Sequence, residues 1–177
     1  MDNPTITLLS FARFGNDFLE KISVAVQHEY QCVVVVKDMH LDLSEYFDAG
    51  RRQYNGDKLL RAVDQVYSSE PDKTLGLFNV DLFIPILTFI FGQAQLGGRT
   101  GIASLYRLSN ERYGIVDEGD YLLERFKKVI IHELGHTFGL KHCHTPSCVM
   151  ISSTYMEDID QKNISLCHKC RNELSID

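Results

Sequence analysis

Short apolar runs and helical spacing alternate in the first third of the chain. Residues 5–9 predict a short strand, and the apolar run at 32–36, rich in β-branched residues, predicts a strand buried on both faces. Apolar residues recur at helical spacing over 14–29 and predict an amphipathic helix between these strands. This order favours a parallel pair joined by a crossing helix, with Cys32 as an ordinary buried strand residue.

The middle of the chain combines one further helix with several strand-like runs. After a polar and aromatic loop at 37–55, an apolar stripe predicts a helix over 58–67. Strands are predicted over 75–84, 88–92 and 102–108. Gly97, Gly98 and Gly101 mark a turn between the last two strands, which predicts an antiparallel hairpin or an edge strand.

The last third of the chain begins with a helical pattern and ends in a region rich in cysteine. Apolar residues fall on one side of a predicted helix over 121–140, and a short helix is predicted over 167–174. The chain of 177 residues has no internal repeats and no linker-like tract. We therefore predict one domain over 1–177, with the sheet and main helices in 1–142 and a cysteine-rich region in 143–177.

The charge and apolar content exclude several classes of protein. A formal net charge of −6 argues against a nucleic-acid partner, because such proteins need a basic surface to neutralise phosphates. The most apolar segment, 82–91, is about half as long as a membrane helix. The N-terminal residues lack the pattern of a secretory signal. We therefore expect a cytoplasmic protein without a membrane or nucleic-acid partner, in which thiols are reduced.

The strongest chemical signal is the pattern H-E-x-x-H-x-x-G-x-x-H, which runs from His132 to His142. Residues four apart on a helix lie one above the other, so His132 and His136 present two imidazoles to one point. Glu133 is badly placed as a ligand but can reach a water on the metal, which suits a general base. Gly139 can adopt positive φ and end the helix, so that His142 turns back as a third ligand.

Three histidine ligands leave the fourth corner of a zinc tetrahedron open for water, as in catalytic sites. Zinc lowers the pKa of its water towards roughly 7 and polarises a carbonyl, so Glu133 with this water would hydrolyse a peptide bond. Two other interpretations remain: unrelated histidines, or a non-catalytic zinc protein that binds peptides or a partner through the same cleft. The presence of Glu133 favours the enzyme, because a binding module needs no base.

A second set of candidate metal ligands follows the third histidine directly. Its members are Cys143, Cys148, Cys167 and Cys170. Two close pairs separated by 18 residues are typical of a structural zinc held by four thiolates, which would anchor the chain after the third histidine to the C-terminal helix.

Other interpretations of the cysteines stay open. The thiols could form disulfides, lie free in the core, hold an iron–sulfur centre or act as a redox pair at Cys167 and Cys170. His144 or His168 could replace a cysteine ligand, although both are expected to be exposed. The long histidine pattern resembles that of the metzincins, in which a methionine turn lies beneath the metal. This resemblance implies that Met150, eight residues after His142, is an apolar support for the site, with plain core packing as the alternative.

The combined pattern H-E-x-x-H-x-x-G-x-x-H-C-x₄-C-x-M followed by C-x-x-C resembles the archaemetzincins, a family of metzincin zinc proteases. Segments 89–94 and 104–108 also resemble that family. The resemblance implies a compact metzincin-like α/β (α+β) domain with a twisted mixed sheet, a backing helix and an active-site helix. The edge strand of the sheet would form the upper rim of the cleft, and residues 102–108 are our candidate for it.

The resemblance also implies a zinc metallopeptidase acting on peptide or protein substrates, with aminopeptidase-like action on short peptides as one form. With the four cysteines as ligands, we expect two zinc ions per chain, one catalytic and one structural. We further expect the protein to act as a monomer.

Overall fold

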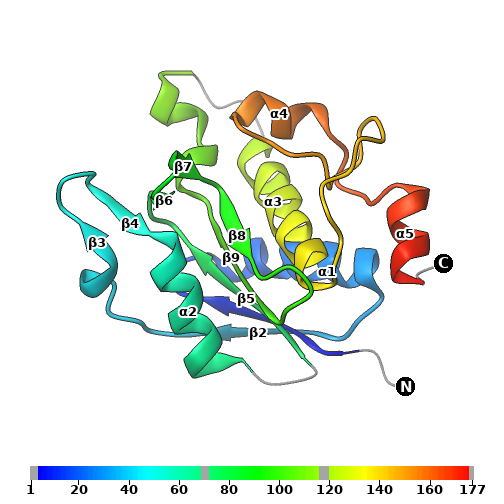
Figure 1. Ribbon diagram of the computed structural model, residues 1–177, viewed down its shortest axis with the longest axis horizontal. Coiled ribbons are helices and arrows are strands. Elements are labelled where there is room, and N and C mark those ends of the chain that lie inside the picture. Colours follow the sequence, from blue (N-terminus) through cyan, green and yellow to red (C-terminus); the bar gives the residue numbers. More distant parts are fainter. Residues whose placement is uncertain (1–3, 69–71, 116–119, 176–177) are drawn as a thin grey trace.

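The main sheet contains five strands, and the computed structural model describes residues 4–68, 72–115 and 120–175. The strands are β1 (Ile6–Ser10), β2 (Val34–Asp38), β5 (Lys73–Phe78), β8 (Gly92–Ala94) and β9 (Thr100–Ser104). Their order is β2-β1-β5-β9-β8 (Figure 1). The first four run parallel and β8 pairs antiparallel with β9. This is the mixed sheet, with one antiparallel edge strand, that the resemblance implies.

A smaller sheet lies beside the main one. It consists of β3 (Phe47–Asp48), β4 (Gln53–Asn55), β6 (Leu82–Ile84) and β7 (Leu87–Ile90), in the order β3-β4-β6-β7. The predicted strand over 75–84 is therefore two strands, β5 and β6, in different sheets. The prediction that 37–55 is a loop is wrong in part, because β3, β4 and a short 3₁₀ segment (Ser44–Tyr46) lie in it.

Helices cover both faces of the main sheet. Helices α1 (Asn16–Tyr30) and α3 (Tyr121–Thr137) pack together on one face, and α2 (Gly56–Tyr67) covers the other (Figure 1). The remaining helical segments are α4 (Met156–Gln161), α5 (His168–Leu174) and two 3₁₀ turns (Tyr106–Leu108 and Asn110–Tyr113). Among the described residues, no helix combines the length and the apolar character that crossing a membrane requires.

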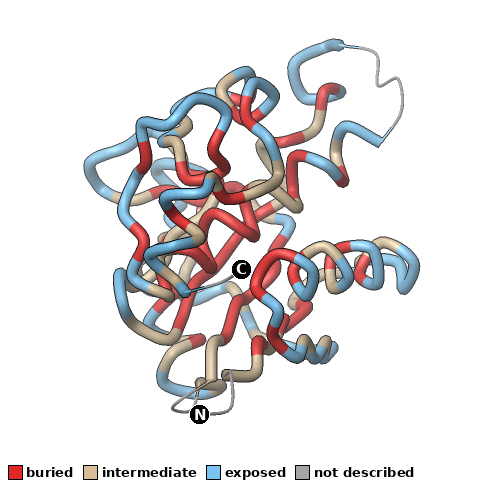
Figure 2. Tube along the Cα trace, turned by 90° about the vertical axis from the view of Figure 1, so that its right-hand side faces the viewer, coloured by how far each residue is buried: buried red, intermediate tan, exposed pale blue. Residues whose placement is uncertain are grey.

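The core is divided by the sheet into two layers. Successive strand residues point to opposite faces, so Ile102 packs towards α2 whereas its neighbour Ala103 packs towards α1 and α3. In the same way Leu8 and Leu9 belong to different layers. Figure 2 shows buried residues concentrated in the interior segments, with exposed residues along the peripheral turns. The layer shared with α1 holds α3 against the sheet, which positions the side chains of its last turns.

Two predictions about strand positions are wrong. Residues 32–36 are not buried on both faces: β2 is the edge of the main sheet opposite β8, and none of its residues is buried. Cys32 is buried, but it precedes the strand. The predicted edge strand over 102–108 is instead β9, which is fully buried between β5 and β8, followed by a 3₁₀ turn. Apolar composition identified these strands but not their neighbours, which depend on pairing between distant segments.

A buried carboxylate connects the C-terminal region to α1. Glu29, which is 2% exposed, accepts hydrogen bonds from the backbone N–H of Leu166 and from Arg171 Nη2, both at 2.8 Å. The segment that leads into α5 is therefore held to a helix about 140 residues earlier in the chain. A charge-assisted, buried arrangement of this kind is costly to break, because its donors are left without an acceptor.

We expect Glu29→Ala to lower the free energy of unfolding by about 2–3 kcal/mol, because it leaves a buried N–H and an arginine without their acceptor. Urea denaturation followed by circular dichroism measures this. Glu20→Ala is the matched control, since Glu20 lies exposed on the same helix. Equal unfolding free energies for the two variants would show that the Glu29 contacts contribute nothing.

Candidate active site

The last turns of α3 and the residue that follows them bring three imidazoles together. The Nε2 atoms of His132 and His136 lie 3.1 Å apart. With His142, these histidines form a group whose ligand atoms all lie within 4.8 Å of one another. Nitrogens held about 2.0–2.1 Å from zinc at tetrahedral angles stand roughly 3.3–3.4 Å apart. The spacing of the three histidines therefore fits one tetrahedral zinc ion.

A Schellman motif ends α3 and returns the chain to this point. The N–H of Leu140 donates to the carbonyl of Gly135, and the N–H of Gly139 donates to that of His136, both at 2.9 Å. Gly139 has a φ of 98°, which residues with a Cβ rarely adopt. The chain therefore leaves the helix axis immediately, and His142 lies beside the two helical histidines instead of beyond them.

Backbone carbonyls orient the two helical histidines. His132 Nδ1 lies 2.9 Å from the carbonyl oxygen of Val149, and His136 Nδ1 lies 2.7 Å from that of Leu140. When Nδ1–H donates to these oxygens, Nε2 is left as the free lone pair. Burial lowers the pKa of all three histidines, well below the ordinary value for His132. The imidazoles are therefore neutral near pH 7 and available as ligands.

Glu133 lies against the edge strand at the mouth of this group. A Cβ on Gly92 of β8 would stand 2.7 Å from Glu133 Cγ and 2.8 Å from Glu133 Oε1, so only glycine leaves room for the carboxylate. Burial raises the pKa of Glu133 to about 8, and the positive charge of Lys162 acts in the opposite direction. Glu133 is thus a buried carboxyl group that lines the same cavity as the three imidazoles.

Met150 lies beneath the helical histidines. It is fully buried, and a Cβ on Gly135 would collide with its sulfur, so Met150 packs directly against the turn between His132 and His136. The carbonyl of Met150 also accepts the N–H of Cys143 at 3.0 Å. The methionine turn therefore joins the histidine group to the cysteine cluster.

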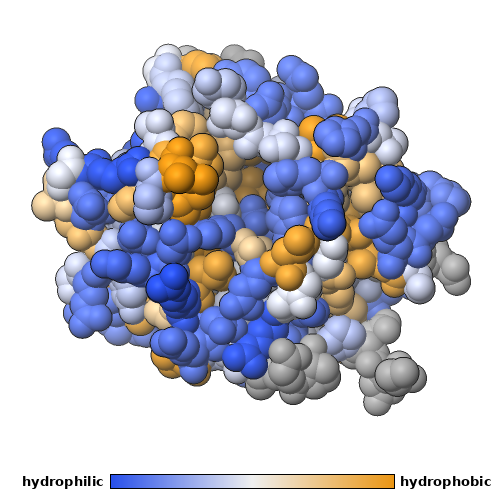
Figure 3. All heavy atoms as spheres, viewed as in Figure 1, coloured by the Kyte–Doolittle hydropathy of each residue, from blue (hydrophilic) through white to orange (hydrophobic). Residues whose placement is uncertain are grey.

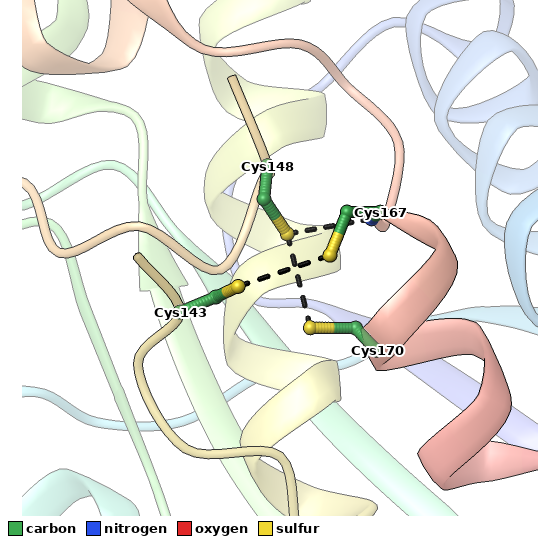
Figure 4. Close-up of side chains that lie close together, drawn as sticks. All are labelled: Cys143, Cys148, Cys167 and Cys170. Atoms are coloured by element: carbon green, nitrogen blue, oxygen red, sulfur yellow. Dashed lines mark hydrogen bonds between the residues drawn. The ribbon is translucent and has the colours of Figure 1, made fainter. Parts of the chain in front are cut away.

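The four C-terminal cysteines converge on one point (Figure 4). The sulfurs of Cys143 and Cys167 lie 3.8 Å apart, as do those of Cys148 and Cys170. Thiolates about 2.3 Å from a tetrahedral zinc ion are about 3.8 Å from one another, so these separations fit one zinc ion. All four thiols are free. A disulfide requires a bond of about 2.05 Å, which these separations exclude.

Backbone N–H groups donate hydrogen bonds to two of the four sulfurs, which favours the thiolate form of these cysteines. The N–H of Thr145 donates to the sulfur of Cys143 at 3.3 Å, and the N–H of Cys167 donates to that of Cys148 at 3.4 Å. Among the described residues, the group of four contains neither His144 nor His168, and both histidines are exposed. The alternative interpretation of Cys167 and Cys170 as a separate redox pair is not favoured, because the sulfurs of all four cysteines lie close together.

A cavity of about 540 Å³ opens over the histidines. Its lining consists of residues 87–94, Val129, His132, Glu133, His136, His142, residues 152–155, Ile159 and Lys162. The upper rim is thus formed by β7 and β8, both of which are edge strands. Figure 3 shows hydrophobic atoms gathered over β6 and β7 beside this hollow, where Ile86 and Leu87 are exposed.

Two residues of this cleft carried no recognisable signal in the sequence. Gly92 lies within a segment that resembles the family, but its contact with Glu133 depends on how β8 pairs. Lys162 is 5% exposed and lies 3.5 Å from His132 Nδ1, although its neighbours in the sequence, Gln161 and Asn163, are exposed. Burial lowers the pKa of Lys162 to about 8. Only tertiary contacts reveal either residue.

Comparisons with known proteins agree with this geometry. A model of peptidase family M54 matches residues 16–176. An archaemetzincin of Sulfolobus acidocaldarius is 40% identical over 138 residues, which are 77% of this chain and 76% of the relative.

Solved structures show the same likeness. The archaemetzincin of Methanopyrus kandleri has a TM-score of 0.83 at 32% identity and covers 97% of this chain and 93% of its own. A zinc-dependent peptidase of Methanocorpusculum labreanum has a TM-score of 0.81 at 28% identity, covering 96% and 99%. The chain therefore belongs to peptidase family M54, the archaemetzincins, and is a zinc metallopeptidase.

Proposed function

We propose that the chain hydrolyses peptide bonds at a zinc ion held by His132, His136 and His142, with Glu133 as the general base. The observation that carries this proposal is the convergence of the three imidazoles, whose ligand atoms lie within 4.8 Å of one another, beside the buried carboxyl group of Glu133, which is outside that group of ligands.

Glu133 accepts a proton from the attacking water and then passes it to the departing amine. Zinc, when bound, lowers the pKa of a coordinated water to about 7 and polarises the substrate carbonyl. Its positive charge also favours the ionised form of a nearby carboxylate, which opposes the effect of burial on Glu133. The general base is then ionised near neutral pH.

The substrate peptide lies in the cleft as an extended strand along β8. This strand is at the edge of the main sheet, so it offers backbone groups to an added strand. We propose aminopeptidase-like action on short peptides as one form of the activity.

A second zinc ion, held by the four cysteines, is structural. Four thiolates leave no position for water, so this ion holds the chain after His142 to α5. We therefore propose that each chain binds two zinc ions. We also propose that residues 1–177 form one catalytic domain and that the protein acts as a monomer. Reduced cysteines fit a cytoplasmic location.

Brief treatment of the two-zinc protein with a competing chelator is expected to remove one zinc ion and all peptidase activity. The catalytic ion has three protein ligands, of which His142 is exposed, whereas the cysteine site has four ligands, three of them buried. Metal analysis, circular dichroism and mass spectrometry of a digested peptide library measure metal content, folding and cleavage.

Restoring zinc is expected to restore cleavage, and the sites of cleavage distinguish terminal from internal hydrolysis. Unchanged cleavage by folded protein that retains only the cysteine-bound ion contradicts the proposal. Two-zinc protein that binds library peptides without cutting any of them supports the non-catalytic interpretation instead.

A further inference from the structure

A buried lysine lines the cleft. Lys162 is 5% exposed and lines the same cavity as Glu133 and His142. Its Nζ donates to the carbonyl oxygen of Ile151 at 2.7 Å. Among the described residues that line the cavity, Lys162 is the one lysine or arginine. The lining of the proposed peptide-binding cleft therefore contains one buried basic side chain.

The charge of Lys162 is not neutralised by an ion pair. The buried or half-buried arginines of this protein each have a carboxylate close by, as in Arg125 with Asp160 at 2.7 Å and Arg171 with Glu29 at 2.8 Å. No described carboxylate lies within the 4.0 Å ion-pair distance of Lys162 Nζ. The negative charge of Glu133 acts through space to raise the pKa of Lys162. Glu133 is, however, the proposed general base. A buried, unpaired cation is unfavourable, which points to an anionic ligand.

A second polar group in the lining of this cavity lacks a hydrogen-bond partner in the described part of the chain. Ser153 lines the cavity, and its Oγ is buried without a hydrogen-bond partner among the described residues. Buried hydroxyls nearly always have a partner in native proteins, and a hydroxyl can donate to an anion. The cavity lining thus contains a buried ammonium group without an ion-pair partner and a buried hydroxyl without a hydrogen-bond partner among the described residues.

We propose that Lys162 and Ser153 form a subsite that binds a carboxylate of the substrate peptide. The carboxylate comes from an acidic side chain or from the C-terminus of a short peptide. One of the three ammonium donors of Lys162 is used by Ile151, which leaves two for the ligand. Val129 and Ile159 also line the cavity, and an apolar, dry environment strengthens a charge-assisted hydrogen bond. This inference rests on the proposed function, because it takes the ligand to be a peptide.

A purely structural role is the competing explanation. Lys162 could serve only to hold the carbonyl of Ile151, next to Met150, in place. Loss of that contact would lower the stability and the affinity for all peptides alike. It would leave unchanged the ratio by which the protein distinguishes a carboxylate from an amide, and this ratio is therefore the informative measurement.

Calorimetric binding to zinc-loaded Glu133→Gln protein tests the subsite without requiring hydrolysis. The probes are N-acetylated octapeptides that carry glutamate at one scanned position, each paired with its glutamine counterpart. A second set compares the free C-terminal carboxylate with the amide. We expect one position, or the free C-terminus, to bind about 10- to 100-fold more tightly as the carboxylate. The peptide set in which the carboxylate form binds more tightly shows whether the bound carboxylate is a side chain or the C-terminus.

Adding Lys162→Met is expected to reduce that ratio to about 2-fold or less, since the side chain keeps its length but loses its charge. Lys37→Met is the matched control and should keep the ratio, because Lys37 is exposed on β2 at the opposite edge of the sheet. If Lys162→Met does not fold, Ser153→Ala provides the second variant and is expected to reduce the ratio about 3- to 10-fold.

Equal binding of the paired peptides, or no binding of either, overturns the subsite. So does a folded Lys162→Met protein that keeps the full ratio. Failure of the proposed function is a separate result: wild-type protein that prefers carboxylate peptides but cuts none retains the subsite and loses the peptidase assignment.

Discussion

Cys148→Ser is expected to release one zinc ion per chain and to unfold the C-terminal region. Cys148 is 2% exposed, and its sulfur contacts Cys170 Sγ and the N–H of Cys167. Structural zinc binds with an apparent free energy of about 10–16 kcal/mol, which is coupled to folding. Whole domains are stable by only about 5–15 kcal/mol, so losing one of four ligands removes a large share of the stability.

The consequence should extend to the histidine group. Cys143 directly follows His142, and its N–H donates to the carbonyl of Met150, which packs beneath the helical histidines. We therefore expect Cys148→Ser to lose peptidase activity together with its structural zinc. Metal analysis, thermal unfolding and peptide cleavage measure the three effects on one preparation.

Cys32→Ser is the matched control for this experiment. Cys32 is also a buried free cysteine, but it lies outside the group of four. The control should keep both zinc ions and lose only the modest stability that a buried polar substitution costs, about 1–3 kcal/mol. Cys148→Ser protein with two zinc ions and the melting temperature of the wild type would show that the cysteines do not hold a metal.

The parts of the site that sequence could predict are those that depend on local geometry. Four-residue spacing places His132 and His136 on one face of any helix, and a glycine after such a helix predicts its end. The observed α3 and its Schellman motif follow these rules. The convergence of the two cysteine pairs could also be predicted from the sequence. The two cysteines of each pair are close in sequence, and two such pairs are typical ligands of one zinc ion.

The parts that could not be predicted depend on pairing between distant segments. Residues 32–36 are strongly apolar, yet β2 is an exposed edge, whereas β9, with the sequence Thr-Gly-Ile-Ala-Ser, is buried between two neighbours. The sequence of a strand alone does not determine which other strands pair with it. For the same reason the sequence did not predict the role of Gly92. Its lack of a side chain matters only because β8 lies against Glu133 in the folded protein. The buried position of Lys162 likewise follows from the path of the chain after α4.

Glu133→Gln is expected to abolish most of the hydrolysis while leaving both zinc ions bound. A positioned general base contributes about 10²- to 10⁴-fold to the rate, and the amide cannot accept the proton of the attacking water. Zinc should remain because the proposed ligands are the three histidines. The amide has nearly the shape of the carboxylate, so it fits the space beside Gly92. It also carries no charge to desolvate, so the melting temperature should not fall.

Glu124→Gln is the matched control, because Glu124 lies on the same helix with its side chain 48% exposed. Steady-state kinetics on one cleaved peptide, with metal analysis of each protein, separates the possible outcomes. A fall in kcat with little change in KM indicates an interaction made only in the transition state, as a base requires. Loss of zinc along with activity would instead make Glu133 a determinant of metal binding. Turnover equal to that of Glu124→Gln would exclude Glu133 as the base and require another proton acceptor in the cleft.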